Sequence, residues 1–123
     1  MWITSKHGFY SVVQIRTDKN LLMVRARVRG DLEKLLEISG QVERNCPEII
    51  STPENDYPFR IIVARDLWEN TLAPSLYKDI DYPNFKNTIT DGERHRIYSA
   101  AWAVYRQLQY RAQGYWQSLL DDD

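Results

Sequence analysis

Aliphatic and polar residues alternate along residues 21–29 of this 123-residue chain. Every even position is aliphatic and three of the odd positions are arginine, so the period of two predicts a strand with one face on the core. The even side consists of Leu22, Val24, Ala26 and Val28, and the odd side of Met23, Arg25, Arg27 and Arg29. Three arginines in line on the face away from the core are the most distinctive chemical feature of the sequence.

A preceding strand is predicted over residues 8–16, which are rich in β-branched and aromatic side chains. Residues 17–20 have turn chemistry, so we expect an antiparallel hairpin. A register in which opposite residue numbers sum to 37 places aliphatic residues opposite one another and Tyr10 opposite Arg27. In that register the core side of the first strand consists of Phe9, Val13 and Ile15.

Two further strands are predicted at residues 48–52 and 57–64. In the second of these, Arg60 and Ile62 lie on the arginine-bearing side of the sheet. The opposite side, which is expected to face the core, consists of Tyr57, Phe59, Ile61 and Val63.

Three helices complete the prediction. Asp31 is a suitable N-cap for the first, and Asp66 with Glu69 has the spacing of a capping box for the second. The last helix follows the N-cap Asp91, begins at residue 93 and runs to about 113, with an extension to 120 if Gly114 does not end it. Inward residues of the first helix are Leu32, Leu35 and Leu36.

The last helix carries two apolar rows side by side. One row consists of Ile97, Ala101, Val104 and Leu108, and the other includes Tyr98, Trp102 and Tyr105. So wide an apolar stripe predicts that the helix contacts more than one surface, with a second subunit as one candidate.

Together these elements predict an α+β fold of order β-β-α-β-β-α-α, with a four-stranded, mainly antiparallel sheet and helices on one face. We expect residues 1–120 to form a single domain and residues 121–123 to form a disordered acidic tail. A net charge of -1 gives the chain no overall positive field that would attract nucleic acid. The sequence contains no run of about 18 apolar residues, so we expect no membrane-spanning segment. The single Cys46 excludes an intrachain disulfide and is typical of a cytoplasmic protein.

Catalytic and metal-binding patterns are sparse. His7 and His95 are far apart, and no phosphate-binding loop or nucleophile elbow is present. Asp79, Asp81 and Asp91 match no calcium-loop spacing, so caps or solvated charges are the better interpretation. The sequence therefore predicts no metal, no cofactor and a non-catalytic protein.

The arginine-bearing sheet face is the stronger candidate, and its residues are Tyr10, Met23, Arg25, Arg27, Arg60 and Ile62. Arginine and tyrosine among aliphatic side chains are typical of protein interfaces, including a homodimer. A structural alternative is that Arg25 and Arg27 pair with Glu48, Asp56 or Asp81 of the same chain. A platform for a nucleotide or single-stranded nucleic acid is less favoured, because no aromatic pair matches an RNA-recognition motif.

Several motifs of this chain occur together in a known group of proteins. They are Met1-Trp2-Ile3, Gly8-Phe9-Tyr10-Ser11, Val24-Arg-Ala-Arg-Val28, Asp56-Tyr57-Pro58-Phe59-Arg60 and Asp81-Tyr82-Pro83-Asn84-Phe85-Lys86-Asn87. With them the chain, up to about Leu108, resembles a family of small uncharacterised bacterial proteins, some labelled plasmid-related. The resemblance implies a free-standing bacterial domain of regulatory or interaction type and contributes no catalytic residues. The labels add one more hypothesis, an accessory or inhibitor protein of a mobile element.

Overall fold

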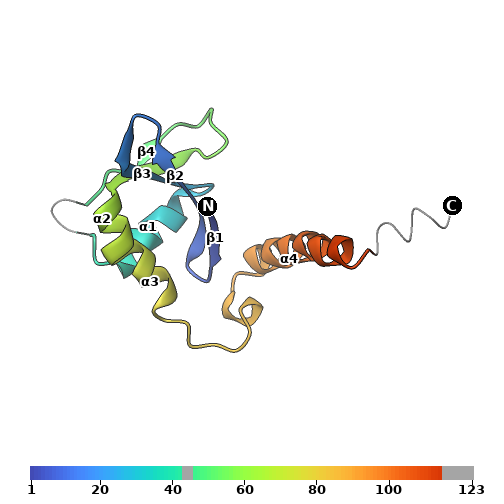
Figure 1. Ribbon diagram of the computed structural model, residues 1–123. Helices are drawn as coiled ribbons and strands as arrows, with labels where there is room; N and C mark the ends of the chain where they lie inside the picture. The colour runs from blue at the N-terminus through green and yellow to red at the C-terminus, as the bar shows by residue number, and fades with distance from the viewer. Residues whose placement is uncertain (43–45, 115–123) are drawn as a thin grey trace. The chain divides into compact units, whose positions relative to one another are not determined.

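The computed structural model describes residues 1–42 and 46–114, and its fold is α+β as predicted. The chain divides into two compact units, Met1–Asp81 and Tyr82–Asp123 (Figure 1). The first unit contains the sheet and its covering helices, and the second contains the long last helix. The predicted tail at 121–123 and the predicted helical extension to 120 lie outside the described residues.

One antiparallel sheet holds the first unit together, with the strand order β1-β2-β3-β5-β4. Its strands are β1 (Trp2–Ser5), β2 (Gly8–Ile15), β3 (Asp18–Ala26), β4 (Ile50–Ser51) and β5 (Phe59–Ala64). The sheet has five strands where four were predicted, because the N-terminal segment adds β1 along the edge of β2. The segment expected at 48–52 contributes only the two residues of β4.

The first unit has two helical stretches, α1 (Arg29–Ile38) and a continuous run of α2 (Arg65–Leu67), η1 (Trp68–Leu72) and α3 (Ala73–Tyr77). Asp31 is not the N-cap of α1: it lies in the first turn, and Val28 occupies the cap position. The capping box predicted at Asp66 does not form, because no side chain caps α2. η1 is a π-helical turn, and its extra width gives the ring of Pro74 room at the start of α3.

The second unit consists of η2 (Lys86–Thr88) and α4 (Gly92–Ala112). Asp91 caps α4 as predicted, since its Oδ1 accepts hydrogen bonds from the backbone N–H groups of Glu93 and Arg94 at 3.0 and 3.1 Å. The helix ends where Gly114 adopts a φ of 74°, a left-handed conformation that glycine tolerates best. No helix among the described residues is long and apolar enough to cross a membrane.

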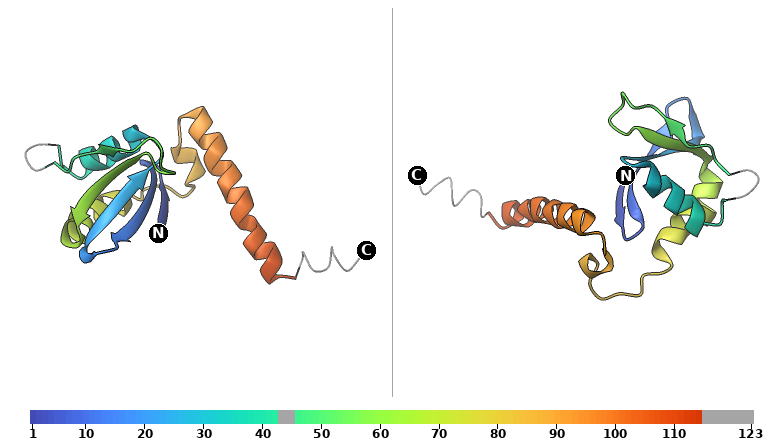
Figure 2. Two further views of the ribbon diagram at one scale, coloured as in Figure 1. Left: turned by 90° about the horizontal axis from the view of Figure 1, so that it is seen from above. Right: turned by 180° about the vertical axis from the view of Figure 1, so that it is seen from behind.

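All helices of the first unit cover the same face of the sheet, as predicted (Figure 2). The shared core contains leucines of α1 and apolar residues of η1 and α3, packed on alternate residues of β2, β3 and β5. Its fully or nearly fully buried members include Tyr10, Val24, Leu32, Leu35, Ile61 and Leu72. The opposite face of the sheet receives no helix of this unit.

The pairing of β2 with β3 differs from the prediction by one residue. Val12 pairs with Val24 and Val13 with Met23, so opposite numbers sum to 36. The reason is the connection: β3 begins already at Asp18, and the register shifts between Gln14 and Ile15. A shift of one residue exchanges the two faces of a strand. Tyr10 and Val12 are therefore in the core, whereas the predicted core residues Phe9, Val13 and Ile15 are only partly buried.

Gly8 closes a tight junction between β2 and α1. The buried carboxylate of Asp31 accepts a hydrogen bond from the backbone N–H of Phe9 at 3.0 Å, and the hydroxyl of Tyr10 donates to the backbone carbonyl of Asp31 at 2.8 Å. A Cβ at Gly8 would lie 2.7 Å from Asp31 Cγ and 2.8 Å from Tyr10 Oη. Only glycine leaves room for both hydrogen bonds.

Replacing Gly8 with alanine should therefore lower the free energy of unfolding by about 1–3 kcal/mol, the usual cost of forcing an extra methyl group into a packed site. Gly30→Ala is the matched control, because a Cβ there meets no atom within 4 Å. It should leave the stability unchanged or raise it by up to about 1 kcal/mol. Urea unfolding of both variants measures the difference, and equal stabilities would contradict this account of Gly8.

Candidate functional site

The face of the sheet opposite the helices carries one continuous cross-strand row. Trp2 pairs with Ser11, Ser11 with Arg25, Arg25 with Arg60, and Arg60 with Ile50. Because directly paired residues project to the same side of a sheet, these five side chains line up across all five strands. We call this surface, extended by Met23, Arg27, Tyr57 and Ile62, the arginine face.

Tyr57 lies at the centre of the arginine face. Its ring is buried, and the guanidinium carbons of Arg25 and Arg27 lie 4.6 and 4.1 Å from the ring centroid. Its backbone carbonyl accepts a hydrogen bond from Arg60 Nη2 at 3.0 Å. Tyr57, two residues before β5, thus contacts Arg25 of β3, Arg27 just after β3 and Arg60 of β5, through cation–π contacts and a backbone acceptor.

The remaining contacts of these arginines are to neutral groups. Arg25 Nη2 donates to Ser11 Oγ at 2.7 Å, and Arg27 Nη1 donates to the backbone carbonyl of Asp56 at 2.6 Å. Arg60 Nη1 lies 3.3 Å from the sulfur of Met23, which is a weak acceptor. In the part of the chain that the structure describes, no carboxylate forms an ion pair with any of the three arginines.

The intrachain ion pairs considered for Arg25 and Arg27 are therefore wrong for these residues. Asp56 contributes its carbonyl oxygen and not its carboxylate. Asp81 instead contacts Lys6, with its Oδ1 3.4 Å from Nζ. Three positive charges remain without a negative partner on one face of the sheet, within the described residues.

Two features of the three arginines lower the free energy of unfolding of the chain without a partner. Arg25 and Arg60 are direct cross-strand partners, and like charges in that position repel each other. The Nε atoms of both are buried and have no hydrogen-bond partner. A buried donor without an acceptor costs about 1–3 kcal/mol. An arrangement that is costly in the free chain is typical of a surface that binds something.

Five of the six predicted site residues come together on the arginine face: Met23, Arg25, Arg27, Arg60 and Ile62. Tyr10 does not, because the register of β2 turns it into the core, where its exposure is 0%. Trp2 was not predicted to join the sheet, and Tyr57 was predicted to lie on the core side. Trp2 is 63% exposed and forms an edge-to-face contact with Phe9 at 6.3 Å between centroids. The aromatic and β-branched residues Trp2, Ile3 and Thr4, which favour strands, were the available signal for β1.

A second polar cluster joins the β1–β2 turn to the end of the first unit. His7 Nε2 lies 3.0 Å from Asp79 Oδ2, and Lys6 Nζ lies 3.3 Å from the backbone carbonyl of Asp79. Burial raises the pKa of Asp79, but the hydrogen bond and charge of His7, together with the charge of Lys6, outweigh it and leave the pKa below its usual value. Within the turn, Ser5 Oγ donates a hydrogen bond to the backbone carbonyl of Gly8 at 2.9 Å and accepts one from the backbone N–H of Gly8 at 3.2 Å, so the cluster acts as a tether.

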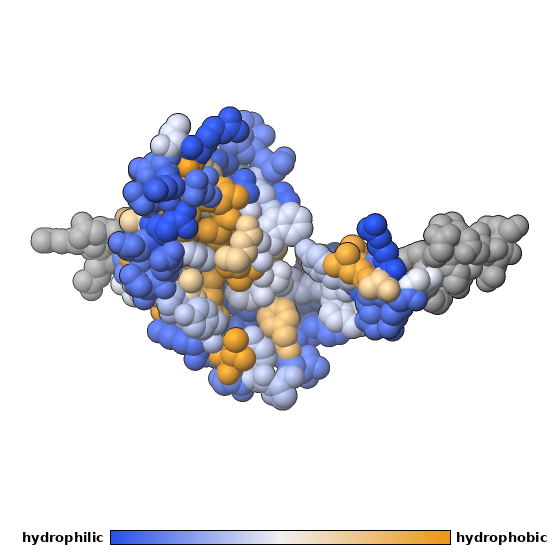
Figure 3. Space-filling model, in the orientation of Figure 1, coloured by the Kyte–Doolittle hydropathy of each residue, from blue (hydrophilic) through white to orange (hydrophobic). Residues whose placement is uncertain are grey.

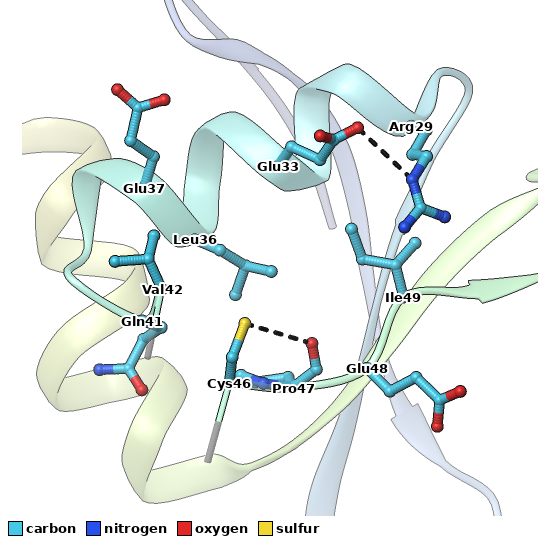
Figure 4. Close-up of a pocket in the computed structure, with 10 residues that line it drawn as sticks. All are labelled: Arg29, Glu33, Leu36, Glu37, Gln41, Val42, Cys46, Pro47, Glu48 and Ile49. Atoms are coloured by element: carbon cyan, nitrogen blue, oxygen red, sulfur yellow. Dashed lines mark hydrogen bonds and ion pairs between the residues drawn. The ribbon is translucent and has the colours of Figure 1, made fainter. Parts of the chain in front are cut away.

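An open groove of about 660 Å³ lies between α1 and residues 46–49 (Figure 4). Leu36, Ile49 and Cys46 converge on its interior, whereas Glu37 and Glu48 point away from it. Glu33 turns toward Arg29, with which it pairs at 3.4 Å. Among the described lining residues, the side chains that converge on the groove are mainly apolar, whereas a small-ligand site needs several convergent polar groups. Within residues 1–42 and 46–114, no group of three His, Cys, Asp or Glu side chains could hold a metal ion.

Comparisons with known proteins give no relative for this chain. No family model, no curated protein and no solved structure matches it. What the chain binds must therefore be inferred from the geometry of its own side chains.

Asp79→Asn should lower the free energy of unfolding near neutral pH, by at most about 1 kcal/mol because the pair is partly exposed. A carboxylate whose pKa is lower in the folded than in the unfolded chain stabilises the fold at pH values above the unfolded pKa, here 3.8. That stabilisation is lost as the pH falls through the lower pKa of the folded state. The difference in stability between parent and variant should therefore persist as the pH falls to near 3.8 and be lost progressively below it. Asp66→Asn, on an exposed carboxylate, is the control, and a pH-independent difference in Asp79→Asn would contradict the tether.

Proposed function

We propose that the protein is a non-catalytic interaction module that uses its arginine face to bind an acidic, partly apolar segment of another protein. The observation that carries the proposal is that Arg25, Arg27 and Arg60 share one sheet face without a carboxylate partner among the described residues. A partner's carboxylates would supply the missing charge through short, bidentate hydrogen bonds.

Apolar side chains beside the arginines favour a protein partner. Trp2 is 63% exposed and Ile62 is 43% exposed, and Met23 lies between β2 and β5 on the same face. Aromatic residues, methionine and arginine are the side chains enriched at protein interfaces, while a nucleic-acid surface draws most of its affinity from many phosphate contacts. Three arginines in a chain of net charge -1 supply few such contacts.

Removing the charge of Arg60 tests whether this arginine contributes to folding stability or is present for binding. Arg60→Met keeps an unbranched side chain of similar length and removes the repulsion with Arg25. We expect the free energy of unfolding to stay equal or to rise by up to about 1 kcal/mol, as is common when a functional residue is replaced. A loss of more than about 2 kcal/mol would show that Arg60 is structural and would count against the proposal.

Binding can be measured by fluorescence with a fluorescein-labelled peptide of alternating glutamate and leucine. Its glutamates are opposite in charge to the arginines, and its leucines suit the aliphatic side chains beside them. Arg25→Ala with Arg27→Ala should weaken its binding by about 10-fold or more, and added salt should weaken binding to the parent. Arg16→Ala with Lys19→Ala is the matched control, because it removes two charges from the other end of the same hairpin.

A single-stranded thymidine oligonucleotide serves as the competing probe in the same assay. Tighter binding of the oligonucleotide than of the peptide would replace the protein partner with nucleic acid. Equal peptide binding by the parent and by the Arg25/Arg27 double variant would exclude the arginine face as the binding surface.

A further inference from the structure

α4 has two apolar rows, and residues 85 and 86 of the second unit contact the aromatic row, in which only Tyr98 is buried among the described residues. The ring of Phe85 stacks on Tyr98 at 5.9 Å, and Lys86 Nζ lies 4.7 Å from the centroid of Trp102. Residues 85 and 86 thus pack on the aromatic row of the helix. Ile97, Val104 and Leu108 of the aliphatic row are 50%, 60% and 64% exposed among the described residues, and Trp102 and Tyr105 are each 53% exposed. Apolar side chains are seen on the surface of this helix in Figure 3.

The aliphatic row has the spacing of a helix-pairing seam. Ile97, Ala101, Val104 and Leu108 recur at steps of four, three and four residues, which is the repeat of a coiled coil. No charged residue interrupts positions 97 to 105, and Arg106 is turned to the opposite side of the helix by its contacts with Trp102 and Tyr110. The seam therefore brings no like charges together when two such helices meet.

The charges at the two ends of the seam are self-complementary, and Glu93 also pairs with Arg96 of its own helix. Glu93 and Arg111 are 18 residues apart (111 minus 93), which is five helical turns, so they lie on the same flank at opposite ends of α4. In an antiparallel pair of identical helices, each Glu93 lies beside the Arg111 of the second copy. In a parallel pair the two copies of Glu93 would lie at the same end but on opposite sides of the seam, as would the two copies of Arg111, so no contact between Glu93 and Arg111 would form.

We propose that α4 binds a second copy of this chain as an antiparallel helix pair. Opposite residue numbers sum to 205 in this pair, which sets Ile97 against Leu108 and Ala101 against Val104. Ala101 lets the two helices approach closely at the centre, while the larger residues close the seam toward its ends. The interface is isologous: the same surface of both copies forms it, as a two-fold axis requires. It is independent of the arginine face.

Light scattering of the full chain over a concentration series tests the pair. The parent should approach twice its 14.6-kDa mass as concentration rises. Val104→Glu should raise the dimer dissociation constant by about 10-fold or more, because it buries a charge in the seam. Ala103→Glu is the matched control: it adds the same charge one residue away, off the seam, and should leave the mass curve unchanged.

The orientation is tested by reversing the end charges. Glu93→Arg alone and Arg111→Glu alone should each weaken the dimer by about 2- to 5-fold, and the double variant should recover the parent's mass curve. Circular dichroism confirms that each variant retains its helix content. A chain that remains monomeric throughout, or a dimer unaffected by Val104→Glu, would overturn the proposal. Single reversals without effect, or no recovery in the double variant, would overturn the antiparallel arrangement.

Discussion

The pairing register of β2 with β3 is the constraint on which the rest of the structure depends. It places Tyr10 and Val12 in the core and, on the other side of the sheet, brings Ser11 beside Arg25. A register one residue away would turn Ser11 toward the leucines of α1 and turn Tyr10 to the opposite face of the sheet. The short turn and the shift after Gln14 therefore decide which chemistry faces the core and which faces outward.

That register also fixes the junction with α1. Tyr10 reaches the first turn of the helix only from the core side of β2, and its hydroxyl bonds the carbonyl of Asp31 there. Gly8, two residues earlier on the same side, leaves the space that this contact needs. On the core face, the polar groups of this junction are hydrogen-bonded and the apolar groups are packed. The stability of that face offsets the repulsion and the unpaired donors on the opposite face.

The arginine face and α4 show two different ways in which a surface remains unsatisfied. Around Tyr57 the positive charges lack a negative partner among the described residues. The guanidinium groups there contact rings, carbonyl oxygens and a sulfur atom, and no described carboxylate. Along α4 the deficit is apolar area left exposed. The proposed acidic partner would supply the missing negative charge, and the proposed second copy would cover the exposed apolar residues. The two surfaces lie in separate units of the chain.

The sequence by itself determined the fold class, the alternation of β3, the cap of α4 at Asp91 and the two apolar rows of that helix. These features follow from local period and capping chemistry, which neighbouring residues decide. Only the tertiary structure decided that Tyr10 is buried, that Tyr57 lies beneath Arg25 and Arg27, and that Trp2 joins the sheet. Strand register and edge pairing depend on contacts between distant segments. A one-residue shift leaves the alternation of each strand intact while exchanging the faces between them.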